Sequence, residues 1–128
     1  MSDPTSKRPA LSWVGKFRVA FRGIYFGVKG QASFAVHLSV MALVIILGVV
    51  LKVGWDSWCV LLLCMALVVT AELLNSAIET LFRGLPAEAQ ERSWPALDVA
   101  AGAVLVASIF AAIIGTIVLL PPLLRYFH

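Results

Sequence analysis

The sequence predicts an all-α integral membrane protein that forms a single domain. Of its 128 residues, 61% are hydrophobic and only 13% are charged, and its mean hydropathy is +0.96. A chain of this composition has too few polar residues to cover a water-soluble core, and it is too short for several domains. Its apolar residues gather in three runs, each long enough to cross a bilayer as a helix. We therefore expect an N-terminal interfacial amphipathic helix followed by three transmembrane helices.

The positive charges are concentrated before the first apolar run. The net charge is +3, and six of the basic residues belong to this N-terminal block: Lys7, Arg8, Lys16, Arg18, Arg22 and Lys29. Basic residues beside a membrane span bind anionic headgroups and mark the cytoplasmic side. The block therefore predicts a cytoplasmic N-terminus, and it gives no reason to expect nucleic acid as a partner.

The first 29 residues divide into two parts. Residues 1–10 carry two prolines and small polar residues, so we expect a disordered N-terminus, with residues 11–128 forming the membrane domain. Within residues 11–29, large apolar side chains recur every three or four positions, while the cations lie largely elsewhere on the helical wheel. A basic, aromatic-rich amphipathic helix is typical of the membrane interface. Gly30 is predicted to end this helix.

The three predicted spans cover about residues 34–53, 57–82 and 98–120. A short turn at residues 54–57 joins the first two. The polar segment 83–97 is predicted to be a loop, because Pro86 and Pro95 should stop any continuous helix. Pro121 and Pro122 are predicted to end the third span. With the N-terminus in the cytoplasm, the 83–97 loop also faces the cytoplasm.

Residues 71–79 place polar groups inside the second span. At about 100° per residue, Glu72, Asn75 and Glu79 fall within roughly 60° of one another on one helix face. A charged side chain within a span costs at least about 2.5 kcal/mol and usually marks a functional site. Glu79 should lie near the cytoplasmic interface, with Glu72 about 10 Å deeper. Because Asp98 opens the third span on the same side, we expect three carboxylates and an amide to converge there.

Such a cluster suits several kinds of chemistry. A carboxylate at headgroup depth can act as a general base on a lipid hydroxyl. A second carboxylate can hold Mg²⁺, with water and phosphates completing the coordination. Paired intramembrane carboxylates also serve proton-coupled transporters, and a Glu–Asn stripe can hold helices together. These residues alone leave a lipid-headgroup enzyme, a transporter and an assembly motif open, although clustering at one interface counts against a transporter.

Two motifs resemble a known family. The segment E-L-L-N-S-A-I-E at residues 72–79, with A-L-D-V-A-A-G-A-V-L-V-A at residues 96–107, is similar to the small prokaryotic integral-membrane diacylglycerol kinases and undecaprenol kinases. Residues 20–24 and 33–38 also resemble the approach to the first span in that family. The resemblance covers roughly residues 15–120, and E-x-x-N-S-A-x-E is its most specific part.

The resemblance implies a kinase of the bacterial cytoplasmic (inner) membrane. The expected assembly is a homotrimer with active sites between subunits at the cytoplasmic interface. The expected reaction transfers the γ-phosphoryl group of MgATP to diacylglycerol or undecaprenol. By position, Glu72 matches the catalytic base, Glu79 a metal-binding carboxylate, and Asn75 with Ser76 the supporting polar residues. The implied nucleotide-binding residues are Glu79, Asp98, Gln31, Glu88 and Gln90. The chain has no G-x-x-x-x-G-K-[ST] motif, so its phosphate contacts must come from elsewhere.

The sequence departs from the family pattern at several positions. Gln31 stands where the family usually has a second metal-binding Glu, and its amide oxygen can coordinate Mg²⁺ without the charge. Leu97 replaces the Lys expected before Asp98. Either Arg83 or Arg92 could supply the missing cation. Alternatively, Arg83 could pair with Glu79 at i,i+4 spacing and compete with the metal. The competing interpretation is a lipid-binding trimeric paralogue that has lost phosphotransfer.

Overall fold

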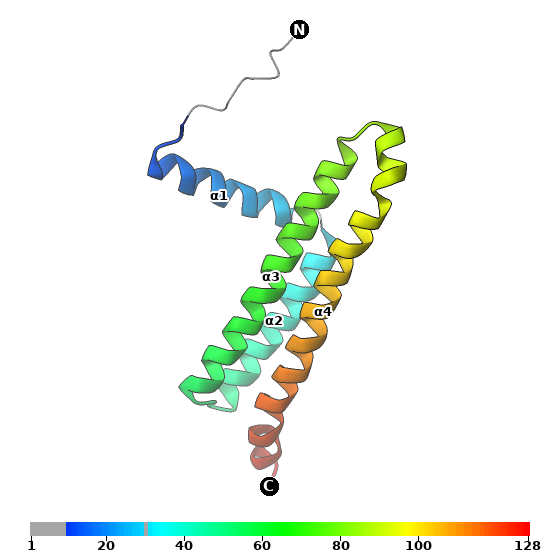
Figure 1. The fold of residues 1–128 in the computed structure, drawn as a ribbon. Coiled ribbons are helices and arrows are strands. Elements are labelled where there is room, and N and C mark those ends of the chain that lie inside the picture. The colour runs from blue at the N-terminus through cyan, green and yellow to red at the C-terminus, as the bar shows by residue number, and fades with distance from the viewer. Residues whose placement is uncertain (1–9, 30) are drawn as a thin grey trace.

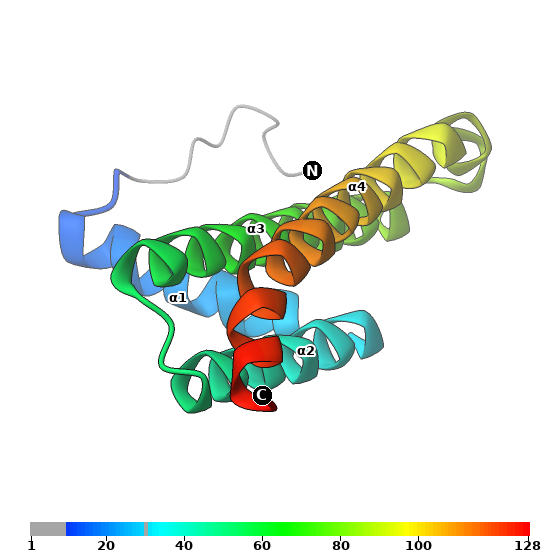
Figure 2. The same ribbon diagram turned by 90° about the horizontal axis from the view of Figure 1, so that it is seen from below.

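The computed structural model describes residues 10–29 and 31–128, and this part of the chain forms four helices. Their bounds are α1 Trp13–Val28, α2 Ala32–Val50, α3 Trp55–Arg83 and α4 Ala87–Tyr126. α2, α3 and α4 run alongside one another, and α1 lies across them (Figures 1 and 2). This confirms the predicted fold class, in which a shorter N-terminal helix precedes three long apolar helices.

The helices divide the molecule into two ends. The α2–α3 turn and the C-terminus lie at one end, and the α3–α4 turn lies at the other (Figure 1). The α3–α4 hairpin continues past the level of α1, because α3 has 29 residues and α4 has 40. At 1.5 Å per residue α4 is about 60 Å long, roughly twice the hydrocarbon thickness of a bilayer. The start of α4 therefore reaches beyond the apolar layer.

The predicted helix stops at prolines were mostly wrong. α4 begins directly after Pro86, but it continues through Pro95, Pro121 and Pro122. A proline removes one backbone hydrogen bond, so Pro95 leaves the carbonyl of residue 91 without its helical donor. Residue 91 is exposed, so this carbonyl can be solvated. Packing between α3 and α4 holds the helix together on both sides of Pro95. The segment 87–97 is therefore helix, not loop.

α1 has the features of a helix that lies on a surface and not in a core. The hydroxyl of Ser12 caps its start by accepting a hydrogen bond from the Gly15 amide at 3.2 Å. None of its residues is buried, and the Lys16 ammonium lies 4.6 Å from the centre of the Trp13 ring. Exposed aromatic and basic side chains on one short helix are typical of membrane interfaces. The predicted disorder of residues 1–9 and the helix break at Gly30 fall outside the described residues.

The inner stripe of α3 changes from apolar to polar along its length. Its buried residues are Leu61, Val68, Glu72 and Ser76, which follow a seven- and four-residue spacing. This spacing places them on one face of the helix. α4 faces the bundle with small residues, among them the buried Ala100 and Ala107, which allow the two helices to approach closely. The charged residue Glu72 therefore occupies a position that packing alone would give to an aliphatic side chain.

Most of the apolar surface is left uncovered by the chain itself. In the most apolar stretches of α2, α3 and α4, only 11%, 17% and 6% of the residues are buried. All three helices are long and apolar enough to cross a membrane. Soluble monomers rarely expose apolar patches of more than a few hundred Å². Lipid or other protein chains must therefore cover these faces, as expected for a multi-pass membrane protein.

A close contact between α2 and α3 yields a stability prediction. A Cβ atom added at Gly48 would lie 2.8 Å from the Trp58 ring, whereas one added at Gly115 would meet no atom within 4 Å. Overpacking costs about 1–3 kcal/mol, which exceeds the roughly 0.5–1 kcal/mol that Ala gains over Gly in a helix. Gly48→Ala should therefore lower the thermal unfolding midpoint in detergent, and Gly115→Ala should not. Equal midpoints for the two variants would contradict the close contact between Gly48 and Trp58.

Candidate active site

The two carboxylates of α3 face the start of α2. Glu72 and Glu79 are seven residues apart, which is two helical turns or about 10 Å along the axis. Both carboxylates bind side chains from residues 31–37, where α2 begins. Glu72 is only 2% exposed, whereas Glu79 is half-buried. The structure therefore places both carboxylates where α3 contacts residues 31–37, and we call this contact the seam. Glu72, the deeper of the two, is enclosed.

Both oxygens of Glu72 have partners on α2. His37 Nε2 lies 3.0 Å from Glu72 Oε1, and the Ser33 hydroxyl donates to Oε2 at 3.4 Å. Ser33 and His37 are four residues apart, so they share one face of α2. A buried carboxylate needs such partners, since removing one member of a buried ion pair typically costs about 3–5 kcal/mol. Phe34, which is 1% exposed, lies between these positions in the sequence and is part of the core.

Both oxygens of Glu79 accept hydrogen bonds from amides. Asn75 Nδ2 donates to Oε1 at 2.9 Å, and Gln31 Nε2 donates to Oε2 at 3.2 Å. Asn75 lies one turn before Glu79 on α3, whereas Gln31 precedes α2. The structure therefore brings Gln31, Asn75 and Glu79 together, and their roles in metal and nucleotide binding stay predictions.

Ser76 attaches α1 to this seam. Its hydroxyl donates to the carbonyl of Gly27 at 3.2 Å, and Ser76 itself is 3% exposed. A Cβ atom at Gly27 would lie only 2.7 Å from the end of the Leu73 side chain, so the absence of a side chain permits this approach. The end of α1 is consequently held one turn from Glu72. Ser76 thus docks α1 onto α3, and the supporting role at the carboxylates stays a prediction.

The predicted nucleotide-binding residues of the hairpin lie apart from this cluster. Gln90 Nε2 donates to the Leu85 carbonyl at 2.9 Å, which closes the α3–α4 turn. Glu88 is exposed in the first turn of α4. Neither residue contacts Gln31 or Glu79 through a hydrogen bond in the described part of the chain. They lie at the α3–α4 turn.

Asp98 was predicted to converge with the two glutamates, and within one chain it does not. The rings of Phe82 and Trp94 pack 4.9 Å apart across the antiparallel α3–α4 hairpin. One turn further along α4, Asp98 therefore lies at about the level of Ile78. However, Asp98 is exposed and, among the described residues, its side chain has no hydrogen-bond or ion-pair partner. Two carboxylates come together here, and the third lies on an outer face at a similar height.

Neither of the two arginines near the turn has an ion-pair partner among the residues that the structure describes. Arg83 and Arg92 are both exposed. The hypothesis that Arg83 pairs with Glu79 was wrong for the part of the chain described, because both oxygens of Glu79 bind amides instead. An exposed i,i+4 pair gains only about 0.3–0.5 kcal/mol. That gain is too small to displace two hydrogen bonds in a partly buried site.

Glu79 and Gln31 are the residues predicted to hold a magnesium ion. The described residues contain no group of three or more His, Cys, Asp and Glu side chains that could form a metal cage. Mg²⁺ instead favours one or two carboxylates together with water and substrate phosphates. Glu79 supplies one carboxylate, and Gln31 and Asn75 turn their amide N–H groups toward it. The carboxylate suits a nucleotide-bound Mg²⁺ ion, whereas an amide N–H cannot ligate a metal, so Gln31 would offer its oxygen only after its amide turns over.

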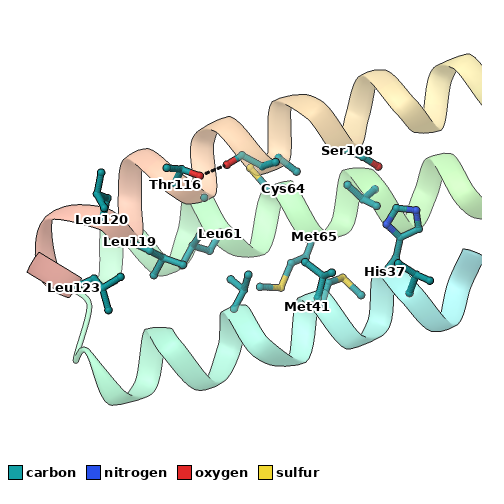
Figure 3. A pocket seen from close by; sticks show the side chains of 17 residues that line it. His37, Met41, Leu61, Cys64, Met65, Ser108, Thr116, Leu119, Leu120 and Leu123 are labelled. Atoms are coloured by element: carbon teal, nitrogen blue, oxygen red, sulfur yellow. Dashed lines mark hydrogen bonds between the residues drawn. The ribbon is translucent and has the colours of Figure 1, made fainter.

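An apolar cavity of ≈ 550 Å³ lies between α2, α3 and α4. His37 is at one end, and Leu119 and Leu123 are near the other (Figure 3). Met41 and Met65 line the middle of the cavity, where flexible side chains adapt to an irregular guest. The cavity therefore extends from His37, which contacts Glu72, along the apolar part of the helix bundle to Leu123.

Sequence reasoning did not assign Ser33 and His37 to the site. A signal was present, because Ser33 and His37 have i,i+4 spacing at the start of an otherwise apolar span. Two polar residues on one helix face, close in sequence to Gln31, indicate a partner surface for the carboxylates of the next span.

These features define a multi-pass membrane protein with a carboxylate site at one end of a helical bundle. Residues 18–119 match the family model described as prokaryotic diacylglycerol kinase. The chain is 35% identical to a diacylglycerol kinase of Synechocystis over an aligned length of 132 residues, covering 96% of this chain and 75% of that protein. It is 31% identical to the undecaprenol kinase of Bacillus subtilis over 104 residues, covering 81% of this chain and 85% of that protein. No solved structure matches it significantly. The chain belongs to the prokaryotic diacylglycerol kinase family, a family of ATP-dependent lipid kinases.

Proposed function

We propose that this protein transfers the γ-phosphoryl group of MgATP to the hydroxyl of a membrane lipid alcohol, either diacylglycerol or undecaprenol. The observation that carries the proposal is the pair of α3 carboxylates that face the start of α2 in different environments. Glu72 is enclosed within the bundle, and Glu79 is half-buried and surrounded by amides. One carboxylate thus suits proton transfer, and the other suits contact with a metal-bound nucleotide.

In this mechanism Glu72 is the general base. The lipid hydroxyl oxygen forms a bond to the γ-phosphorus while the bond from that phosphorus to the β–γ bridging oxygen breaks, and ADP leaves. The proton of the hydroxyl passes to a carboxylate oxygen of Glu72. General-base catalysis of this kind contributes about 10²–10⁴-fold. Because Glu72 is 2% exposed, the hydroxyl must displace one of its present partners to reach it.

Glu79, Gln31 and Asn75 are proposed to receive the nucleotide. Mg²⁺, when bound with ATP, neutralises charge on the β- and γ-phosphates. Glu79 would contribute a carboxylate oxygen and Gln31 an amide oxygen to it. Asn75 would keep the Glu79 carboxylate oriented through the 2.9 Å bond that it already makes. Leu97 stands where the family has a lysine, and we propose that Arg83 or Arg92 supplies this positive charge to the phosphates instead.

A homotrimer is proposed because the site is incomplete in one chain. Asp98 lies on an outer face of the described structure, and Glu88 and Gln90 lie at the turn. A neighbouring subunit packed against α4 could bring these nucleotide-binding residues to a Glu79 cluster. The uncovered apolar faces of the three spans support such an assembly, since lipid or protein must cover them.

The proposed orientation puts the site at the cytoplasmic face of the bacterial inner membrane. The basic residues of α1 and the preceding segment favour that side. The Ser76–Gly27 bond holds the end of α1 beside the two carboxylates, so the site and the surface helix lie at the same membrane boundary. The acceptor could place its hydrocarbon in the apolar cavity and its hydroxyl near the His37 end.

An acceptor comparison tests the proposed function. Purified full-length protein in mixed micelles would receive labelled MgATP and either diacylglycerol or undecaprenol at equal mole fraction. Mass spectrometry would identify phosphatidic acid or undecaprenyl phosphate as the product. Formation of either product supports the proposal. If a folded trimer forms neither product while a family relative is active in the same micelles, the inactive lipid-binding paralogue becomes the better interpretation.

The metal role predicts the effect of Glu79→Ala. Loss of this carboxylate should raise the Mg²⁺ concentration needed for half-maximal activity by about tenfold or more, a change that even outer-shell metal partners produce. Mg²⁺ titrations at fixed total ATP would measure the shift. Glu91→Ala is the matched control, because Glu91 is an exposed carboxylate in the first part of α4. An unchanged Mg²⁺ requirement in Glu79→Ala would remove Glu79 from the metal site.

A further inference from the structure

The two oxygens of Glu72 are held unequally. Oε1 lies 3.0 Å from Nε2 of His37, whereas Oε2 receives a longer bond of 3.4 Å from the hydroxyl of Ser33. The His37 side chain is 23% exposed, while Ser33 is an exposed residue. Charge-assisted bonds from N–H to carboxylate typically measure about 2.7–2.9 Å, so the His37 contact is close to the strong range and the Ser33 contact is not.

The His37 contact requires a proton on Nε2. An ionised carboxylate can only accept hydrogen bonds, so the ring nitrogen facing it must be the donor, whether the ring is neutral or charged. His37 makes no other side-chain hydrogen bond in the described part of the chain. His37 also lines the mostly apolar cavity (Figure 3). Its polar interaction is therefore committed to Glu72.

We propose that His37 is a positioning residue that fixes Oε1 of Glu72 and leaves Oε2 as the oxygen that takes the proton of the acceptor hydroxyl. The hydroxyl of the lipid replaces the hydroxyl of Ser33, which makes the weaker and more accessible bond. This exchange leaves the number of hydrogen bonds to Oε2 unchanged. The inference rests on the proposed function, because it assumes that Glu72 is the base.

Positioning matters because Glu has three rotatable side-chain bonds. Without a partner on Oε1, the carboxylate of Glu72 can turn away from the acceptor while remaining in the bundle. Misplacing a reacting group by about 1 Å can cost roughly 10²-fold in rate. MgATP makes no contact with Glu72 in the proposed site, and the lipid makes one hydrogen bond to it, which contributes only about 0.5–1.5 kcal/mol. The effect should therefore fall mainly on kcat, leave KM for MgATP nearly constant and raise KM for the lipid by about tenfold at most.

Kinetic variants test the positioning role. His37→Phe keeps a planar ring and removes the donor, and we expect kcat to fall by about 10²-fold with KM for MgATP unchanged and KM for lipid changed by less than about tenfold. His37→Gln restores an N–H donor and should recover most of the loss. Ser33→Ala should cost less than His37→Phe, since the acceptor hydroxyl replaces Ser33. Failure of His37→Gln to recover more activity than His37→Phe would overturn the inference.

A second measurement does not depend on activity. The chain has two histidines, His37 and His128, so ¹⁵N-histidine labelling of the full-length protein gives two sets of ring signals. His128→Gln assigns them. Glu72→Gln should shift the Nε2 signal of His37 and not that of His128, and Glu91→Gln should shift neither. An unmoved His37 signal in Glu72→Gln would overturn the inference.

The two measurements also separate this inference from the proposed function. If wild-type protein transfers phosphate but Glu72→Gln does not shift the Nε2 signal of His37, the positioning role is wrong and the proposed function stands. If wild-type protein transfers phosphate to no lipid alcohol, the proposed function fails and the positioning role fails with it. The hydrogen bond would then be a structural contact only, whatever the NMR signal shows.

Discussion

Replacement of Glu72 by Gln should reduce turnover by about 10²–10⁴-fold, the usual contribution of a general base. Gln has nearly the same shape as Glu, so the packing around this 2% exposed side chain is disturbed little. Its amide cannot take a proton from the lipid hydroxyl. KM values should stay close to those of wild type, because the interaction lost is one that matters in the transition state.

Steady-state transfer of labelled phosphate would measure the Glu72→Gln effect. Glu91→Gln is the control, since it neutralises an exposed carboxylate of the same chain outside the seam. Thermal unfolding of both variants in detergent would show that any loss of activity is not a loss of fold. Turnover within threefold of wild type in a folded Glu72→Gln protein would assign the base to another residue.

Arg83→Ala should nearly abolish phosphotransfer if Arg83 provides the cation that the family places at position 97. An arginine that stabilises a transferring phosphoryl group can be worth about 10³–10⁵-fold. Arg83 is the last residue of α3, one turn beyond Glu79, and it is exposed. The Glu79 oxygens bind amides, so Arg83 is available for phosphate.

Three further variants sharpen the Arg83 prediction. Arg92→Ala tests the second candidate cation, and Arg125→Ala is a control because Arg125 lies in the last turn of α4, at the opposite end of the bundle. Adding Leu97→Lys to Arg83→Ala should restore part of the activity by returning a positive charge beside Asp98. Full activity in Arg83→Ala would exclude Arg83 as the compensating residue.

The helices could be predicted because their signals are local. Long apolar runs and the periodic aromatic residues of α1 depend only on neighbouring sequence, and they gave the correct helix order. The limits of α4 could not be predicted in the same way. Pro95 and Pro121 are helix breakers on local grounds, but α4 continues through both. At Pro95, packing against α3 and the exposed position of residue 91 account for this.

The site was predictable in part. Glu72, Asn75 and Glu79 share a face because one helix carries them at suitable spacing, so their proximity follows from the sequence. Their roles in catalysis stay predictions. Ser33 and His37 join Glu72 only because α2 packs beside α3, which is a tertiary relation that no local pattern specifies. The position of Asp98 also depends on how the helices pack. The sequence predicted its height along the bundle, but it could not show that Asp98 faces away from the seam.

The central claim is that the γ-phosphoryl group passes directly from ATP to a lipid alcohol at the Glu72–Glu79 seam. A single-turnover experiment tests it most directly: wild-type protein loaded with labelled MgATP is mixed with acceptor micelles, and ADP and phospholipid are quantified in the same quenched samples. We predict that ADP and phosphorylated lipid appear at the same rate and in equal amounts. ADP without phosphorylated lipid, or no turnover of either with an acceptor that a relative phosphorylates, would contradict the account.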